Sequence, residues 1–252
     1  SGSSYTGNLA SGIEVSGNWQ FSAGSAVTMG LSTVTFTGAT TAYIYSFSAS
    51  SQFTGVNIDK GAGNYLYIHS TSTATLKFGG MVTLTSGIFI GLPNITTIFS
   101  NNIAGSGQYM FQDGTVSLEK SSGTQSVVTN PANYFNNLTV NTGGTVTFTG
   151  NTQVRKNLVI QAGVLDPQGF QIEIRGNWTN NVGTAGFTEG TGRVIFSGPS
   201  ANQLCSDETF NILELNKISF SLQVDGSTVT CAQYDYAVGS VTVTNNGTFT
   251  AS

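Results

Sequence analysis

The side chains that could support catalysis are few and scattered along the sequence. Glycoside hydrolysis needs two carboxylates at a set separation, and Asp207 and Glu208 are the only adjacent pair among 12 acidic residues. His69 is the single histidine, which leaves little basis for a catalytic triad or a histidine-rich metal site. We therefore expect no catalytic residue, no cofactor, no metal site and no enzyme. A carbohydrate-active enzyme is a minor alternative that requires Asp207, Glu208 and a further acid to converge in a cleft.

Two cysteines, Cys205 and Cys231, could carry redox chemistry. They are too few for a disulfide framework. They can form one disulfide, which an oxidising extracellular compartment would favour, or remain two buried thiols. The sequence leaves both options open.

The aromatic residues fall into two groups that differ in how they recur. One group occupies equivalent positions in recurring phrases, which is typical of rows stacked in a core: Trp19, Trp178, Phe53, Phe135 and Phe210. The other group falls on segments that look irregular, and we expect it to form an exposed aromatic face: Tyr43, Tyr45, Tyr65 and Tyr67. Such a face could stack on sugars, so a glycan is a candidate partner.

Asparagine recurs in ways that suggest both modification and structure. Four N-x-S/T sequons predict possible glycosylation sites, at Asn94, Asn137, Asn177 and Asn246. Two of these, Asn137 and Asn177, lie inside recurring phrases and have a structural alternative. Asparagines also stand beside corresponding strands, where their amides could form ladders between coils: Asn18 and Asn177, and Asn57, Asn136 and Asn211.

The sequence contains internal repeats, so a repetitive fold must position these side chains. The phrase GIEVSGNW at Gly12–Trp19 returns as QIEIRGNW at Gln171–Trp178, and VTFTG at Val34–Gly38 returns as VIFSG at Val194–Gly198. Three related phrases end on glycines spaced by 76 residues, Gly87, Gly163 and Gly239. The spacing predicts a single domain over residues 1–252, built from about three units of about 80 residues. The units run roughly over residues 12–90, 91–166 and 167–252.

Short runs of alternating apolar and polar residues extend along the chain, as at Val34/Phe36 and Leu138/Val140. This alternation indicates strands with one buried face, and the Gly, Asn and Ser between the runs indicate turns. No window has the roughly 3.6-residue period of an amphipathic helix. We predict an all-β parallel β-solenoid, because the recurring phrases are alike in their strands and unlike in loop length. A β-sandwich array is the alternative, since it also uses short, regularly spaced strands.

Charge and composition exclude several classes of partner. Only 8% of the residues are charged, and eight Lys and Arg leave a formal net charge of −4. Nucleic-acid binding relies on a basic face, so we expect no nucleic-acid partner. No apolar run approaches the roughly 18 residues of a membrane helix, so we expect no membrane insertion. Abundant Thr, Ser, Asn and Gly in place of Lys and Glu are typical of secreted β-proteins and predict an extracellular or cell-surface location.

The order of the recurring phrases resembles the β-solenoid repeats of very large secreted bacterial surface proteins and adhesins, especially of a Bacteroidetes-like group. The phrases behind this resemblance are Gly176-Asn177-Trp178, Gly190–Gly198 and Phe210–Leu213, with Leu158–Leu165 before them. The middle of the chain departs from the pattern, because Phe99-Ser100-Asn101 replaces the tryptophan phrase. The resemblance implies a stalk or a surface fibre and brings no catalytic residues with it.

Together these features predict an extracellular structural protein, a β-solenoid subunit that stacks head to tail into a cell-surface filament. Neither end of the sequence shows a capping pattern, and an uncapped coil edge can be covered by a second copy or by continuation in a longer protein. The alternative is an adhesin stalk or binding module of a larger surface protein that recognises a glycan.

Overall fold

The computed structural model describes residues 5–6, 12–24, 27–28, 31–48, 50–199 and 202–252. The chain is an all-β, parallel β-solenoid of about 11 turns, and its described residues include one short 3₁₀-helix, η1 (Thr184–Gly186). The predicted fold class is confirmed and the β-sandwich alternative is wrong. The chain divides into two compact units: unit 1 comprises residues 1–120 and 126–128, and unit 2 comprises residues 121–125 and 129–252.

Unit 1 is built from short strands. In chain order they are β1 (Tyr5–Thr6), β2 (Ile13–Val15), β3 (Trp19–Phe21), β4 (Val27–Thr28), β5 (Thr33–Phe36), β6 (Ala42–Ser46), β7 (Gln52–Phe53), β8 (Gly55–Asp59), β9 (Tyr65–Ile68), β10 (Leu76–Phe78), β11 (Val82–Ser86), β12 (Ile88–Gly91), β13 (Thr96–Phe99), β14 (Ile103–Gly105), β15 (Gln108–Phe111) and β16 (Thr115–Leu118). Strand β17 (Thr124–Val127) has residues in both units.

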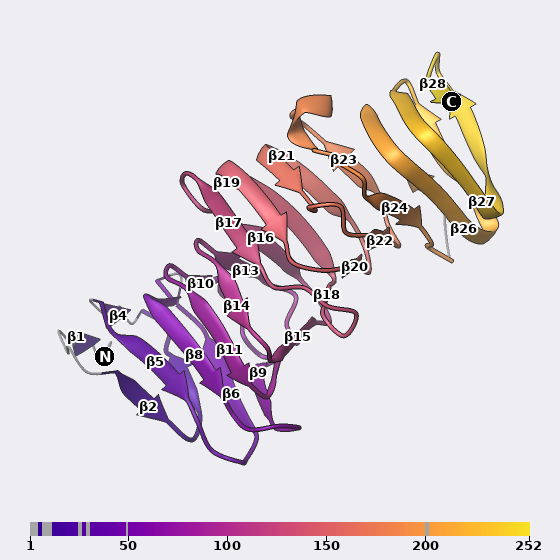
Figure 1. Ribbon diagram of the computed structural model, residues 1–252. Helices are drawn as coiled ribbons and strands as arrows, with labels where there is room; N and C mark the ends of the chain where they lie inside the picture. The colour runs from indigo at the N-terminus through magenta and orange to yellow at the C-terminus, as the bar shows by residue number, and fades with distance from the viewer. Residues whose placement is uncertain (1–4, 7–11, 25–26, 29–30, 49, 200–201) are drawn as a thin grey trace. The chain divides into compact units, whose positions relative to one another are not determined.

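From β5 onward each turn of unit 1 contributes three strands, so a strand pairs with the third strand before it and the third after it. The rows are β5-β8-β11-β14, β6-β9-β12-β15 and β7-β10-β13-β16, all with parallel pairing. In Figure 1 the strands of successive turns lie side by side within this unit. The turns differ in length: Val34 pairs with Val56, 22 positions later, and Val56 pairs with Val82, 26 positions later.

Unit 2 mixes short strands with long ones, of which β26 and β27 are the longest at 18 and 17 residues. The elements are β18 (Tyr134–Phe135), β19 (Asn137–Phe148), β20 (Thr152–Val154), β21 (Leu158–Asp166), β22 (Ile172–Ile174), β23 (Trp178–Asn180), η1, β24 (Arg193–Phe196), β25 (Gln203–Leu204), β26 (Glu208–Asp225), β27 (Thr228–Thr244) and β28 (Thr248–Ala251). One row is β19-β21-β23, and the other is β18-β20-β22-β24-β26-β27-β28. The described pairings are parallel here too.

The core consists of inward-facing strand residues stacked from turn to turn. In unit 1 the rings of Phe53, Phe78 and Phe99 stack, with centroid distances of 5.6 and 4.9 Å and interplanar angles of 15° and 9°. In unit 2 the rings of Trp178 and Phe210 meet edge to face at 5.3 Å. The predicted core rows are confirmed by burial for Phe53, Phe135, Phe210 and Trp178. Trp19 is only half-buried, although its ring packs against Phe53 at 5.5 Å.

The three glycines that are 76 residues apart share one structural role. Gly87, Gly163 and Gly239 all have positive φ angles, of 88°, 77° and 134°. A Cβ atom at each would lie 2.8 Å from Lys60 Cβ, 2.5 Å from Thr142 Cγ2 and 3.2 Å from Lys217 Cβ, respectively. Glycine is therefore required at all three by conformation and by close approach. This equivalence is consistent with the repeat, while the division into three units stays a prediction.

Candidate functional site: an outward aromatic face

Alternation along two neighbouring strands of unit 1 turns a group of aromatic rings outward. On β6 the side chains of Ala42 and Ile44 are fully buried, and on β9 those of Leu66 and Ile68 are fully buried. Successive strand residues point to opposite faces. The outward residues are consequently aromatic and half-buried, and with the two that follow the strands we call them the aromatic face: Tyr43, Tyr45, Phe47, Tyr65, Tyr67 and His69.

The rings of the aromatic face contact one another both across and along the strands. Tyr43 pairs in register with Tyr67, and their centroids lie 5.5 Å apart with an interplanar angle of 23°. Tyr45 and His69 stack at 4.5 Å and 29°, and Tyr65 and Tyr67 at 5.6 Å and 28°. The face is therefore a continuous cluster of rings.

The sequence placed Tyr43, Tyr45, Tyr65 and Tyr67 on one exposed face, and the structure brings these four together on a half-exposed surface. The four residues lie on the regular strands β6 and β9, and not on irregular segments as the sequence suggests. The addition of Phe47 and His69 was missed. The alternation with Ala42 and Leu66 would have been a sufficient signal for the outward direction.

Two polar groups of the aromatic face, the imidazole of His69 and the hydroxyl of Tyr67, can donate hydrogen bonds. The backbone amide of Thr71 donates to His69 Nδ1 at 3.2 Å, so a neutral imidazole carries its proton on Nε2. Burial raises the pKa of Tyr67, and the neighbouring Tyr65 and Tyr43 raise it further. The Tyr67 hydroxyl thus keeps its proton at neutral pH and can donate a hydrogen bond.

The strands on either side of the aromatic face add no charge to it. Gln20 on β3 pairs with Tyr45, while Ile88 and Ile90 on β12 pair with Tyr65 and Tyr67; Ile88 is half-buried and Ile90 is buried. The next outward residues, on β15, are Gln108 and Met110. Across these five strands the outward positions are aromatic, aliphatic or amide, so the surface is uncharged and suited to an uncharged ligand.

The side chains of the two adjacent acids do not converge, because that of Glu208 is buried in the core and that of Asp207 faces solvent. Asp207 is exposed and accepts a hydrogen bond from the Thr228 amide at 2.6 Å, whereas Glu208 is 1% exposed. Glu208 Oε2 accepts hydrogen bonds from Trp178 Nε1 and Asn180 Nδ2 at 3.0 and 2.8 Å. Burial raises the pKa of Glu208 to about 7, and these hydrogen bonds reduce the increase. The arrangement that a glycosidase hypothesis requires is therefore missing at this pair.

Both cysteines are free and buried, which corresponds to the second of the two options left open by the sequence. The thiol of Cys205 lies 3.4 Å from the Ser206 carbonyl oxygen and that of Cys231 lies 3.9 Å from the Thr250 carbonyl oxygen. Burial raises the pKa of both thiols, so they stay protonated and unreactive at neutral pH.

The four sequons occupy two kinds of position. Asn94 and Asn246 are exposed in turns, and Asn246 has a positive φ of 60°. Asn137 and Asn177 are half-buried members of an asparagine ladder. The backbone N–H of Asn157 donates to Asn137 Oδ1, and the backbone N–H of Asn177 donates to Asn157 Oδ1 at 2.9 Å. Glycosylation of all four stays a prediction.

The predicted asparagine ladders differ in chemistry from those found. In the ladders of Asn18, Asn157 and Asn177 the side-chain oxygen accepts a hydrogen bond from a backbone N–H of the next turn. Asn18 Oδ1 accepts from the Tyr43 amide at 3.0 Å, and Asn177 Oδ1 accepts from the Leu204 amide at 2.9 Å. Asn57 lies outside such a ladder and accepts a hydrogen bond from Thr85 Oγ1.

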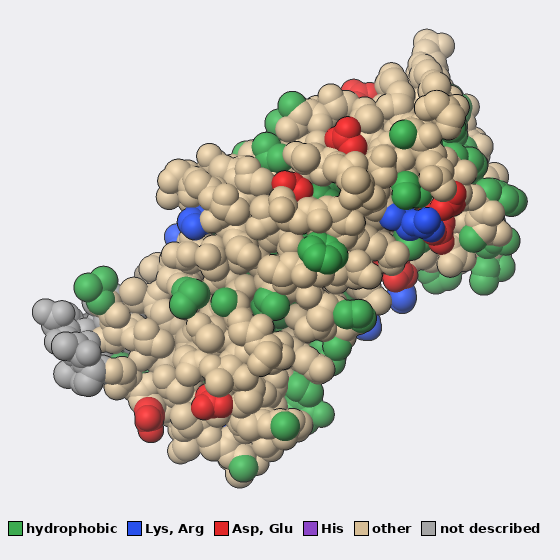
Figure 2. Space-filling model, viewed as in Figure 1, with side chains coloured by type: hydrophobic (Ala, Val, Ile, Leu, Met, Phe, Trp, Pro, Cys, Tyr) green, Lys and Arg blue, Asp and Glu red, His purple; other side chains and the backbone are tan. Residues whose placement is uncertain are grey.

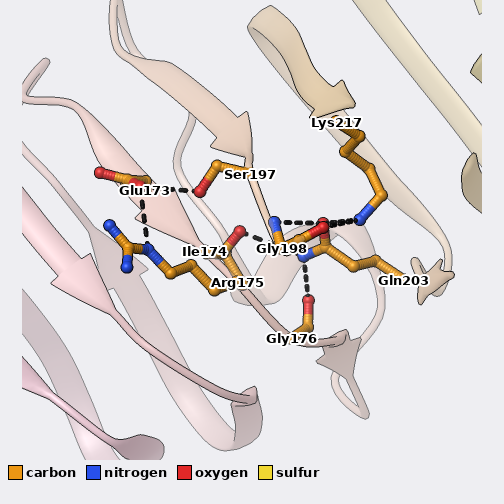
Figure 3. A network of polar contacts seen from close by, with 8 residues as sticks. All are labelled: Glu173, Ile174, Arg175, Gly176, Ser197, Gly198, Gln203 and Lys217. Carbon is orange, nitrogen blue, oxygen red and sulfur yellow. Dashed lines mark hydrogen bonds and ion pairs between the residues drawn. The ribbon is translucent and has the colours of Figure 1, made fainter. Parts of the chain in front are cut away.

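Two buried lysines were missed in the sequence, although they end equivalent phrases. Lys60 and Lys217 are each 1% exposed, and each donates to a backbone carbonyl at 2.6 Å, of Thr37 and Gly198 respectively. Lys217 also donates to Gln203 Oε1 at 2.7 Å, and Gln203 in turn donates to the carbonyl of Ile174. Figure 3 shows this network converging on Gly198 and Gln203. Burial lowers the pKa of both lysines.

Replacing Lys217 by methionine is expected to lower the free energy of unfolding by about 1–3 kcal/mol, because the Gly198 carbonyl loses its charged donor in a buried place. Urea unfolding followed by circular dichroism measures the effect. Lys156→Met, at an exposed lysine of the same unit, is the matched control and should change the stability by less than about 0.5 kcal/mol. Equal effects of the two substitutions would show that the network does not stabilise the coil.

Further observations bear on metals, membranes and relatives. Among the described residues, no group of three or more His, Cys, Asp or Glu is placed to hold a metal ion. In the same part of the chain no helix has the length and apolar character needed to span a bilayer. No family model, no curated protein and no solved structure matches this chain.

Proposed function

We propose that the chain is an extracellular structural protein, a β-solenoid that stacks head to tail into a cell-surface filament. The observation that carries the proposal is that each turn is a template for the next one. Strands pair in parallel register from turn to turn, and inward-facing residues continue the core rows. A strand added by a second copy would extend the hydrogen-bond ladder and the core together.

The exposed part of the long strand β27 is where a second copy could add a strand. Leu215 and Val224 on β26 are fully buried, and they pair with Tyr236 and Val243 on β27. Tyr236 and Val243 occupy the same core-type positions but are 62% and 46% exposed. Strand β28 pairs only with the beginning of β27, at Thr228–Cys231. A further turn laid on β27 would bury the exposed core-type side chains.

The surface supports an extracellular location and self-association. In Figure 2 charged side chains are sparse, and most of the visible surface is uncharged polar side chain or backbone. With 8% charged residues, little electrostatic repulsion opposes stacking of copies. The likeness of the sequence phrases to bacterial surface solenoids points in the same direction.

Tyr236→Lys is expected to abolish filaments while leaving the isolated chain folded, because a lysine is tolerated at a 62% exposed position, whereas a stacked turn would bury its charge in the apolar core row that continues from Leu215. Negative-stain electron microscopy of the native material at physiological salt measures filament length. Val182→Lys, which places the same charge at a 41% exposed valine in a loop, is the control and should leave filaments intact.

Long uniform fibres formed by the parent chain and lost in Tyr236→Lys support the filament. Isolated short rods formed by the parent chain contradict it. Rods would favour the alternative hypothesis of an adhesin stalk, in which a longer protein supplies the turn that covers β27.

A further inference from the structure

We propose that the aromatic face of unit 1 binds an uncharged polysaccharide. The proposal goes beyond the filament and does not depend on it, since the face lies on the outward side of β6 and β9 within one unit. It rests on three observations: the rings form one continuous cluster, the cluster is outside the core, and the surrounding strands bring no charge to it.

The aromatic face is not needed to fill the interior. The core beneath it is complete, because Ala42, Ile44 and Leu66 are fully buried. Aromatic pairs across neighbouring strands do stabilise a sheet, by about 0.2–1 kcal/mol each. A Thr or Val ladder would serve the same purpose on a solvated face, so six partly exposed rings on adjacent turns call for an external contact.

Charge selects the class of ligand. The outward residues of β3, β6, β9, β12 and β15 include no acid, lysine or arginine. Single-stranded nucleic acids also stack on aromatic platforms, but they need a positively charged groove. Acidic glycans need cations in the same way. An uncharged polymer meets no electrostatic penalty here.

Hydroxyl chemistry separates a polysaccharide from a lipid or an apolar protein surface. Four tyrosines give the face four phenol groups, and covering these with an apolar partner would cost the hydrogen bonds they make with water. A hexose ring has an apolar face of C–H bonds, which packs on an aromatic ring, and hydroxyls at its edge. The hydroxyl of Tyr67 and the Nε2–H group of His69 can each donate a hydrogen bond to a hydroxyl oxygen of the sugar.

Isothermal titration calorimetry of the intact chain tests the proposal, with cellohexaose, mannohexaose and xylohexaose as uncharged probes and hexagalacturonate as the charged probe. At least one uncharged hexasaccharide should bind, and hexagalacturonate should not. Tyr67→Ala and Tyr45→Ala should each weaken binding by about ten-fold or more, since each removes a ring from the cluster. Tyr67→Phe keeps the ring and should lose less.

Phe170→Ala is the matched control, because it removes a ring that is 37% exposed elsewhere in the chain, and it should bind as the parent does. Circular dichroism and thermal melting confirm that each variant is folded. If either Tyr45→Ala or Tyr67→Ala fails to fold, the other variant still tests the proposal. The proposal is overturned if no uncharged probe binds, if only hexagalacturonate binds, or if both alanine variants bind like the parent. None of these results depends on filament formation, so the two proposals succeed or fail separately.

Discussion

Phe78→Ala is expected to lower the free energy of unfolding of unit 1 by about 3–5 kcal/mol, the usual cost of removing a fully buried phenylalanine ring. Phe78 is 1% exposed and lies between two stacked rings, with centroids 5.6 Å from Phe53 and 4.9 Å from Phe99. It also meets Phe89 edge to face at 5.9 Å. Its removal leaves a cavity that neighbouring turns cannot fill, because their strands are fixed by parallel pairing on both sides.

Denaturant unfolding followed by circular dichroism measures this loss. Met81→Ala is the control, since Met81 stands three residues away and is 50% exposed. Its removal should change the stability by less than about 1 kcal/mol. If both alanine substitutions cost the same, the stacked phenylalanine row does not dominate the stability of the unit.

The strand pattern and the core could be predicted from the sequence because both follow from alternation. Val34 and Phe36 were expected to face inward and are fully buried. The close approach of Gly87 to Lys60 could not be predicted, since it depends on which turn lies beneath which. A glycine repeated at a constant spacing indicates a shared role but does not name the residue it contacts.

The side chains at the candidate sites were predicted less well, for a different reason. Residue type alone makes Asp207 and Glu208 a candidate pair. Strand alternation separates them: Glu208 has the same parity as the buried Phe210, while Asp207 faces solvent. The same alternation, applied from Ile44, gives the outward direction of Tyr43 and Tyr45. Alternation from a secure core residue would have located both the buried carboxyl and the aromatic face.

The buried carboxyl of Glu208 should make the stability of unit 2 depend on pH. Its pKa is raised from 4.5 to about 7 in the folded chain, first by burial and then by Glu189. The folded state therefore holds the proton more tightly than the unfolded state. The contribution of protonated Glu208 to the free energy of unfolding is fully present below about pH 4.5. It is lost as the pH rises to about 7 and does not change above that. The difference corresponds to about 3 kcal/mol, at about 1.4 kcal/mol for each pH unit.

Glu208→Gln isolates this contribution from that of the other acids. A glutamine side-chain oxygen can accept from Trp178 and Asn180 as Glu208 Oε2 does, and the Thr209 amide loses its acceptor at all pH values. When the pH falls from 8 to 4, the free energy of unfolding of the parent should therefore rise by about 3 kcal/mol relative to that of Glu208→Gln. Asp207→Asn, which removes the exposed neighbouring carboxyl, is the control and should leave the pH dependence nearly unchanged.

Tryptophan fluorescence gives the measurement at the residue concerned. The chain has two tryptophans, so Trp19→Phe leaves Trp178, which donates to Glu208, as the sole reporter in unit 2. Trp19 Nε1 is buried and has no hydrogen-bond partner among the residues that the structure describes, so replacing that ring should cost little. In this background urea midpoints are recorded from pH 4 to pH 8 for the parent and for Glu208→Gln. A constant difference between the two across that range would mean that Glu208 is ionised in the folded coil, and that its hydrogen bonds from Trp178, Asn180 and Thr209 outweigh its burial.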